Sequence, residues 1–525
     1  MANLNLTDNT KHGDTVILLD LHWRYDENAQ LEHIRTLSLM ALHQSIERLG
    51  IPATTIHYAS NWNKEDIIRY IDKWMSKTGT KRPIFAYSSL FGMDIFGSIS
   101  NNPENVKLAN LIKSTWPDSK QILGGPNPIP TTEPLTKLDA IFNGRALWLM
   151  ELWLQDKPIP SVNHYVNDYG IDTFFNPTSA IPEDPIVPHL HEDYCLGPQD
   201  ILSFETRLGC KFNCTFCSYE FRGAKNTKDA QVAHLVEFFE EAKQFGIKRF
   251  SCVDDTFNEE HQKVELLHSA VKQLDYQPRI VGFNRFDIMH HYQDQGQMEM
   301  FDEMGFHGHF WGIESLHPQA SKVVRKRSRT DEFFKLLEKI RDDYPHWWTT
   351  GSFITGIPGE SVDHAYEMAK RYLGDGLISG YGVHPLMLKK HGENQSDSEA
   401  DLVKDPAKYG IYLTGKEKPW ELLLDWVSED SSYAEAKKAR DRMAKLAFKN
   451  GIGIITPWEA LCKDALGTPM FTREGKKEFG DKLIEASRQG GEDKILEVTK
   501  YFFNEGYNQL IEDYVSRKFK YVDSL

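Results

Sequence analysis

Short apolar runs of β type alternate with amphipathic stretches of helical period through the first 155 residues, and this alternation constrains the fold most. Strands are expected at 16–21, 53–58, 83–88, 120–124 and 138–142, and helices near 31–49, 64–77, 104–115 and 145–155. Such spacing predicts right-handed crossovers and a parallel, doubly wound sheet. Sheets of this kind bind ligands at the carboxyl ends of their strands.

A second alternating series begins near residue 200, after a segment rich in Pro, Asn and Asp. Its strands are expected near 201–207, 248–253, 279–284, 308–313, 350–355 and 379–384, with helices such as 229–245 and 331–343. Six β/α units predict a partial or complete parallel barrel, with the chemistry in loops at the strand ends. Beyond about residue 390, helices are expected at 420–427, 433–449, 457–465, 474–488 and 492–516.

These patterns predict an α/β protein that is divided into five segments. They are an N-terminal tail (1–14), a doubly wound domain (15–158), a linker (159–199), a barrel (200–388) and a mainly helical C-terminal domain (389–525).

Composition narrows the classes of function. The net charge of −15, from 61 Lys and Arg against 76 Asp and Glu, argues against a broad nucleic-acid surface. No apolar run approaches the roughly 20 residues that span a bilayer, and the first residues lack the pattern of a signal peptide. We therefore expect a soluble cytoplasmic protein that does not bind membranes. Six cysteines in 525 residues are too few for a disulfide scaffold.

Three of these cysteines, Cys210, Cys214 and Cys217, fall within the stretch GCKFNCTFC, directly after the first expected barrel strand. A disulfide would leave one thiol over and is disfavoured in a reducing compartment. Structural zinc needs four ligands, and no second cysteine pair exists, so a distant histidine would have to complete the site. The third alternative is an iron–sulfur cluster whose fourth iron is left open for substrate.

The spacing C-x3-C-x-aromatic-C, with Phe216 as the aromatic residue, resembles the signature of the radical S-adenosylmethionine (SAM) enzymes. The resemblance implies a [4Fe-4S] cluster on the three cysteines, with SAM on the open iron and Phe216 beside its nucleoside. It also implies reductive cleavage of SAM to a 5′-deoxyadenosyl radical, and an external one-electron reductant such as flavodoxin or ferredoxin.

Further short motifs across about residues 200–385 resemble those of the same family and occur in the same order. The implied SAM contacts are Asp254 and Asp255 near the amino group, Arg285, Glu314 at the ribose, Lys326 at the carboxylate, and Ser352, where many relatives carry Asp. The stretch GIPGE, residues 356–360, is similar to the turn that flanks adenine. Each of these motifs has a simpler alternative: Glu314 could cap a helix, Arg285 could pair with Asp287, residues 356–359 could be only a turn, and Lys326 could be solvated.

The first domain, immediately before such a barrel, resembles the flavodoxin-like cobalamin-binding domain of the B12-dependent radical SAM subclass. The implied cobalamin contacts are Ser88, Ser89, Gly124, Gly125 and His22. His22 matches the start of a D-x-H-x-x-G element, but Tyr25 occupies the position of its glycine, so an ordinary loop histidine is the alternative.

The leading hypothesis is a cobalamin-dependent C-methyltransferase that acts on an unactivated carbon of a small molecule or peptide. One alternative is a radical rearrangement, cyclisation or oxidation without cobalamin, in which the first domain is vestigial. Another is a non-catalytic scaffold stabilised by zinc or by an iron–sulfur cluster. Residues 384–387 and the C-terminal domain are expected to select the substrate.

Overall fold

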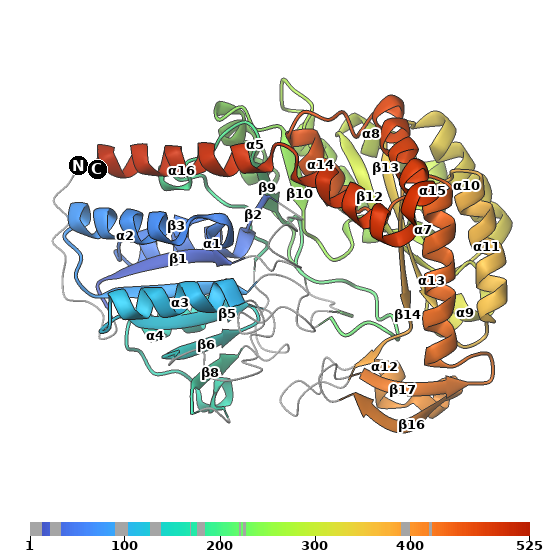
Figure 1. Ribbon diagram of the computed structural model, residues 1–525, viewed down its shortest axis with the longest axis horizontal. Coiled ribbons are helices and arrows are strands. Elements are labelled where there is room, and N and C mark those ends of the chain that lie inside the picture. Colours follow the sequence, from blue (N-terminus) through green and yellow to red (C-terminus); the bar gives the residue numbers. More distant parts are fainter. Residues whose placement is uncertain are drawn as a thin grey trace. The chain divides into compact units, whose positions relative to one another are not determined.

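The computed structural model describes residues 13–21, 33–89, 103–125, 138–167, 170–175, 184–219, 222–223, 227–389, 400–418 and 423–525. The chain forms two compact units (Figure 1). The first unit is Met1–Ala180, Pro188–Gly197 and Gly506–Leu525, and the second is Ile181–Val187 and Pro198–Glu505. No helix in the described ranges is long and apolar enough to cross a membrane.

The first unit is a doubly wound sheet between helices. Its strands are β1 (Thr15–Leu21), β3 (Ala53–Ile56), β4 (Pro83–Ser89), β5 (Lys120–Gly125), β6 (Ala140–Asn143), β7 (His164–Val166) and β8 (Asp172–Phe175), and its helices are α1 (Leu37–Arg48), α2 (Lys64–Thr78), α3 (Pro103–Thr115), α4 (Leu147–Leu154) and α16 (Tyr507–Ser524). The short strand β2 (Ile34–Arg35) is not part of this sheet. The sheet order is β3-β1-β4-β5-β6-β8-β7, parallel except for the β7–β8 pair. Its first five positions have the flavodoxin-like order 2-1-3-4-5, with the switch point between β1 and β4.

Local sequence explains the helix ends in this unit. The Asn63 side chain accepts a hydrogen bond from the Glu65 N–H and caps the start of α2. Gly79, with φ +72°, ends the same helix in the left-handed conformation that glycine tolerates. The buried core lies on the strands, where Val16 and Leu18 are fully buried, as the apolar runs predict.

The second unit contains the expected partial barrel. Its parallel strands are β9 (Ile201–Phe204), β10 (Arg249–Cys252), β11 (Arg279–Arg285), β12 (Phe306–Glu314), β13 (Trp348–Thr355) and β14 (Gly380–Pro385), and its helices are α5 (Val232–Gln244), α6 (His261–Val271), α7 (Phe286–Tyr292), α8 (Gln297–Glu303), α9 (Pro318–Val323), α10 (Thr330–Asp343) and α11 (Val362–Gly374). Consecutive strands pair in parallel from β9 to β14. The α/β prediction is therefore confirmed.

The rest of the second unit is helical, as expected, but it also contains a small antiparallel sheet. It comprises β15 (Leu388–Lys389), β16 (Ile411–Lys418), β17 (Leu423–Ser428), α12 (Asp401–Lys404), α13 (Tyr433–Lys449), α14 (Pro457–Ala465) and α15 (Arg473–Asn504). The predicted helix at 420–427 is wrong, because β17 occupies most of it. Trp426 is buried while Val427 is exposed, the alternation of a half-buried strand.

Two segments also differ from the expected division. Residues 159–199, which were expected to form a linker, contribute β8, and this strand pairs in parallel with β6. The last helix, α16, lies along the first unit (Figure 1) instead of in a separate C-terminal domain. Buried Lys518 Nζ lies 2.7 Å from Asp193 Oδ1, a contact between positions far apart in sequence that no local pattern reveals.

Candidate active site

Three cysteines lie in the loop that follows β9. Cys210 Sγ lies 3.4 Å from the Thr256 hydroxyl, and the Tyr219 backbone N–H donates to Cys217 Sγ over 3.4 Å. The Cys217 N–H donates to the Cys214 carbonyl. Burial raises the pKa of Cys217 to about 11 and also raises that of Cys210. Both are therefore thiols at pH 7, and metal binding has to displace their protons because thiolates are the ligands.

The spacing of the three sulfurs bears on which metal they fit. A tetrahedral zinc ion with Zn–S bonds of about 2.3 Å holds its sulfurs about 3.8 Å apart. Among the described residues, the clusters whose ligand atoms converge within 4.8 Å contain histidine and carboxylate groups, and not this cysteine trio. An iron–sulfur cluster binds each thiolate at a different iron, so it fits more widely spaced sulfurs.

A buried carboxylate fixes the start of the cysteine loop. Glu259 Oε2 accepts a hydrogen bond from the Lys211 backbone N–H at 2.8 Å. Its Oε1 lies 3.2 Å from Arg207 Nη1 and 3.4 Å from Lys263 Nζ. The two cations compensate a charge that would be costly to bury alone.

The middle of the loop is held by segments from later in the chain. The Leu402 N–H at α12 donates to the Thr215 carbonyl at 3.0 Å, and the Thr215 hydroxyl donates to the Val323 carbonyl at 2.9 Å. Arg325 pairs with Asp401 over 2.7 Å, joining the end of α9 to α12. The loop is therefore fixed between barrel and C-terminal elements.

Arg285, at the end of β11, contacts both a cysteine and a carboxylate. Its Nη1 donates to Cys214 Sγ at 3.3 Å, while Nε and Nη2 bind Asp287 at 2.9 and 2.7 Å. The guanidinium carbon lies 3.9 Å from the centroid of the Phe212 ring. Arg285 therefore pairs with Asp287 and contacts a motif cysteine at the same time. Hydrogen bonds to ligand sulfurs tune the potential of an iron–sulfur cluster.

The two adjacent acids after β10 have different surroundings. Asp254 is buried, accepts from the Thr206 N–H at 2.7 Å and pairs with Lys263 at 2.8 Å, so protein groups occupy its carboxylate. Burial raises the pKa of Asp255 to about 7, against a hydrogen bond from Tyr219 that lowers it. Of the two, Asp255 is the partly exposed one.

Glu314 and Lys326 form a pair at the end of β12. Lys326 Nζ donates to Glu314 Oε1 at 2.8 Å and to the Gly312 carbonyl at 2.7 Å. Lys326 is 9% exposed, so the alternative of a solvated lysine is wrong. Glu314 has φ +65°, and the β12–β13 register shifts between Gly312 and Glu314. Such irregularities cluster at functional sites because they re-aim side chains.

Small and apolar residues lie around this pair. Ser352, on β13, is flanked in register by Gly312 on β12 and Gly382 on β14. Phe216, from the cysteine loop, packs in a cluster with Ile354 of β13. The structure thus joins the aromatic residue of the cysteine motif to the strand that carries Ser352.

The turn at 356–360 depends on glycine. Gly356 has φ +84°, and a Cβ there would lie 2.7 Å from Trp426 and 2.8 Å from Ala436. The Gly359 N–H donates to Asp430 at 2.6 Å. The turn therefore packs closely against the C-terminal elements, which a simple surface turn would not do.

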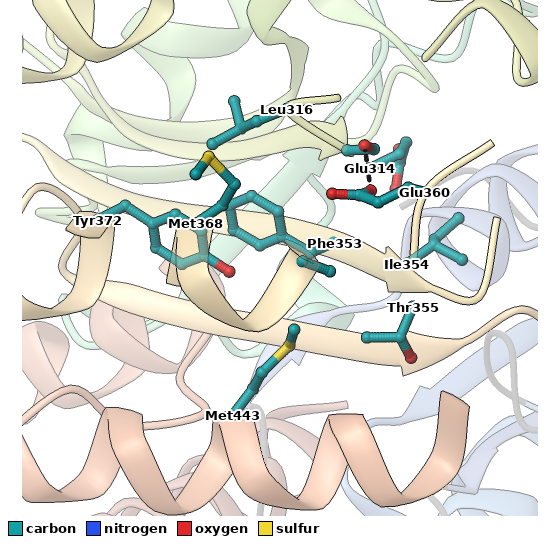
Figure 2. Close-up of a pocket in the computed structure, with 11 residues that line it drawn as sticks. Glu314, Leu316, Phe353, Ile354, Thr355, Glu360, Met368, Tyr372 and Met443 are labelled. Carbon is teal, nitrogen blue, oxygen red and sulfur yellow. Dashed lines mark hydrogen bonds between the residues drawn. The ribbon is translucent and has the colours of Figure 1, made fainter. Parts of the chain in front are cut away.

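Figure 2 shows a pocket beside Glu314, with a cavity volume of about 20 Å³. Glu314 and Glu360 lie on one side, and Ser315 Oγ donates to Glu360 Oε2 at 2.5 Å. The opposite side is mostly apolar and comprises Phe353, Met368, Tyr372 and Met443. Ligand pockets usually measure about 300–1,000 Å³, so this one is too small for a whole nucleoside cofactor.

In the first unit, polar groups meet at the switch point of the sheet. Ser88, at the end of β4, is in register with Asp20 of β1, and its hydroxyl lies 3.3 Å from Asp20 Oδ1. Asp20 also accepts from the Thr36 hydroxyl at 2.8 Å and lies 3.3 Å from His57 Nδ1. This is where doubly wound sheets bind ligands. Asp20, Thr36 and His57 were not predicted as site residues, although the Asp20-Leu21-His22 stretch pointed to this edge.

Gly124 lies next to Ser88 in the register of the same edge. Among the described residues, a Cβ at Gly124 would meet only the Phe142 carbonyl, at 3.8 Å, which leaves space there for a bulky neighbour. Gly125 follows with φ +146°. Ser89 ends β4, while His22 lies outside the described residues.

A family model decides the identity of the second unit. The model of the radical SAM superfamily matches residues 205–372, which include the cysteine loop, Arg285, Glu314 and Ser352. Residues 205–372 belong to the radical SAM superfamily. Membership implies a [4Fe-4S] cluster and SAM, and the cysteine loop fits that cluster.

Curated relatives that contain a similar segment resemble this chain distantly. The ribosomal protein uS12 methylthiotransferase RimO of Elusimicrobium minutum is 21% identical over 41% of this chain and 54% of its own length. A putative methylthiotransferase of Methanocaldococcus jannaschii is 24% identical over 36% of this chain and 44% of its own length. The chain therefore spans about half the length of the curated relatives it matches, or less.

Solved structures match more of the fold. The cobalamin-dependent SAM radical enzyme OxsB, with aqua-cobalamin and SAM bound, has a TM-score of 0.58 at 12% identity over 98% of this chain and 80% of its own. The radical SAM methyltransferase TsrM from Kitasatospora setae, with cobalamin and a [4Fe-4S] cluster bound, has a TM-score of 0.53 at 12% identity, over 90% of this chain and 100% of its own. The fold of this chain, including its first unit, is thus that of cobalamin-dependent radical SAM enzymes.

Proposed function

We propose that this protein is a cobalamin-dependent radical SAM methyltransferase that acts on an unactivated carbon of a small molecule or peptide. One observation carries the proposal: each unit presents its own cofactor region at the carboxyl ends of parallel strands. In the second unit this region is the loop of Cys210, Cys214 and Cys217. In the first it is the edge of Ser88 and Gly124 at the switch point.

The cysteine loop provides three thiolate ligands and leaves a coordination position for the amino and carboxylate groups of SAM. When bound, such a cluster supplies the electron that cleaves SAM to methionine and the 5′-deoxyadenosyl radical. That electron has to come from an external donor such as flavodoxin or ferredoxin. Arg285 holds a positive charge and a hydrogen bond against Cys214, which favours the reduced cluster.

The remaining SAM contacts follow from the neighbours of the loop. Phe216 and Ile354 offer an apolar surface to the nucleoside. Glu314 and Lys326 pair with each other without ligand, and they exchange partners when the ribose hydroxyls and the methionine carboxylate arrive. Asp255 accepts from the methionine amino group, which favours its ionised form. Ser352 lies beside Gly382 in register, where an added Cβ would meet no described atom closer than 3.8 Å, and this leaves room for the cofactor on that side.

In the first unit, bound cobalamin would carry the methyl group between SAM and substrate. Gly124 and Gly125 allow close approach of the corrin, and Ser88 supplies a hydroxyl fixed by Asp20. We include Ser89 by its position next to Ser88. His22 belongs to an incomplete D-x-H-x-x-G element, so the proposal does not require it as a cobalt ligand.

A second candidate is methylthio transfer, because the curated relatives named above are methylthiotransferases. They match at most about half of their own length, so their activity does not carry over by itself. A radical reaction without cobalamin, in which the first unit is vestigial, is the remaining alternative.

Anaerobic reconstitution with iron, sulfide and hydroxocobalamin separates these candidates. After desalting, the proposal predicts about one corrinoid per chain, measured by its visible spectrum. With reductant and SAM but no substrate, S-adenosylhomocysteine should form in proportion to bound cobalamin. A protein that retains no corrinoid and forms only 5′-deoxyadenosine would contradict the methyltransferase proposal and favour the vestigial domain.

A glycine variant tests where cobalamin binds. Gly124→Val fills the open position on β5 with a residue that strands tolerate, so the fold should persist while corrinoid retention falls at least tenfold. Gly374→Ala, at the end of α11, is the control, because no described atom lies within 4 Å of its added Cβ. Equal corrinoid content in both variants would place cobalamin elsewhere.

A further inference from the structure

A second group of metal-binding side chains lies at the amino ends of the barrel strands. Asp302 comes from the end of α8, His307 from the start of β12, and His346 from the loop before β13. Asp302 Oδ1 lies 2.6 Å from His346 Nε2 and 3.9 Å from His307 Nε2. The two imidazole centroids are 4.7 Å apart, with the rings at 84°. All three ligand atoms lie within 4.8 Å of one another.

We propose that Asp302, His307 and His346 bind a divalent transition-metal ion of the zinc class. Two imidazoles and one carboxylate are a common ligand set for zinc, with solvent in the remaining position. Zinc bonds of about 2.0–2.2 Å bring ligand atoms to about 3.5 Å from one another, so a shift of roughly 1 Å by His346 would admit the ion. Asp302 and His346 are partly exposed, which gives the ion a path from solvent.

Neighbouring groups hold the three side chains in place. Trp347 Nε1 donates to Asp302 Oδ1 at 3.0 Å. Lys476 Nζ donates to the carbonyls of Pro345 and Trp347, the residues on either side of His346. Metal sites depend on such outer contacts to orient their ligands.

A similar trio in the first unit lacks this capacity. His43, Glu47 and His191 also converge within 4.8 Å. However, His191 Nδ1 accepts a hydrogen bond from the Asp193 backbone N–H at 3.1 Å. In a neutral imidazole the Nε2 atom then carries the proton, and it lies 3.3 Å from Glu47 Oε1. His191 therefore presents a proton, and not a lone pair, to the centre of this trio, so the trio serves as a control.

The proposed site is separate from the radical chemistry. His307 and Glu314 occupy opposite ends of β12, seven residues apart, which corresponds to about 23 Å. An ion bound there cannot reach SAM at the carboxyl end of the strand. Its effect is to join α8, β12 and the loop before β13, so the proposal holds or fails independently of the methyltransferase proposal.

Equilibrium dialysis of the cluster-reconstituted protein against micromolar zinc tests the site, because a loaded cluster keeps zinc from the cysteines. Zinc and iron per chain are then measured by mass spectrometry. The proposal predicts about one zinc per chain for the wild type. His346→Ala and Asp302→Asn should each lose at least 90% of it with unchanged iron, whereas His191→Ala should retain it.

Cobalt(II) provides a second readout that does not depend on activity. In the difference spectrum between cobalt-loaded and cobalt-free cluster-reconstituted protein, cobalt at the proposed site should give d–d bands, and His307→Gln should abolish them. Absence of zinc from the wild type, or its retention in both His346→Ala and Asp302→Asn, would overturn the proposal. Loss of zinc in His191→Ala alone would assign the metal to the other trio and would also overturn it.

Discussion

Arg285 donates a hydrogen bond to Cys214 Sγ at 3.3 Å while its other two nitrogens bind the Asp287 carboxylate. One guanidinium thus links a cysteine of the radical SAM motif to a fixed anion. Burial alone would lower the pKa of Arg285, but Asp287 raises it, so the charge beside Cys214 is permanent. This contact joins the end of β11 to the loop after β9.

Replacing Arg285 by lysine should lower the reduction potential of the reconstituted cluster by tens of millivolts. A lysine keeps the charge but cannot bind Asp287 at two points and also donate to Cys214. A redox titration followed by electron paramagnetic resonance measures the shift. Arg325→Lys is the control, since Arg325 binds Asp401 and the Asn213 carbonyl. An unchanged potential in Arg285→Lys would show that the contact does not tune the cluster.

Replacing Glu314 by glutamine should weaken SAM binding about tenfold, or about 1.4 kcal/mol. The reason is that the amide is a poorer acceptor for ribose hydroxyls and no longer orients Lys326. Calorimetric titration of the reconstituted protein with SAM measures the change, and iron content should stay constant. Lys322→Gln, an exposed position on α9, should bind SAM normally. Equal affinities in the two variants would remove Glu314 from the SAM site.

Replacing Lys518 by methionine should destabilise the first unit by about 3–5 kcal/mol, because buried Asp193 would lose its counter-charge. Lys518 also donates to the Asp193 carbonyl at 2.8 Å. Urea unfolding of the full chain measures the loss, with exposed Lys520→Met as the control. A similar unfolding midpoint for both variants would mean that α16 does not stabilise this unit.

Lys476 should make stability depend on pH. Burial lowers its pKa from 10.5 to about 7, so between these values the unfolded chain binds more protons than the native one. Its contribution to stability therefore rises with pH across this window, by up to about 1.4 kcal/mol per unit. The unfolding free energy of wild type relative to Lys476→Met should increase from pH 7 to pH 9. Lys477→Met, which alters an exposed pair with Asp481, should show no such trend.

Hydrophobic periodicity was sufficient to predict both parallel sheets, because a strand buried on both faces leaves a continuous apolar run such as residues 16–21. The periodicity wrongly predicted a helix at 420–427, because the alternation of buried and exposed residues around Trp426 extends over only a few positions. It also could not place α16, because the Lys518–Asp193 pair joins residues 325 positions apart. Contacts between distant charged residues leave no local signal.

The candidate site was predicted from motif spacing, and its supporting groups were not. The resemblance to the radical SAM motif predicted the cysteines and Phe216 directly. Lys263, which holds Asp254, and Glu259, which binds the Lys211 N–H, emerge only from the fold. The i, i+4 spacing of Glu259 and Lys263 was the one available signal, but such pairs are common on solvated helices.

Radical SAM chemistry at the cysteine loop is measured as 5′-deoxyadenosine formed from SAM and dithionite by the anaerobically reconstituted protein. We expect product from the wild type and from Cys462→Ala, which changes a buried cysteine remote from the motif in sequence. Cys214→Ala should lose both iron and product and keep its far-ultraviolet circular dichroism spectrum. Equal product from Cys214→Ala and Cys462→Ala, or stoichiometric zinc in place of iron in the wild type, would show that the loop does not hold a radical SAM cluster.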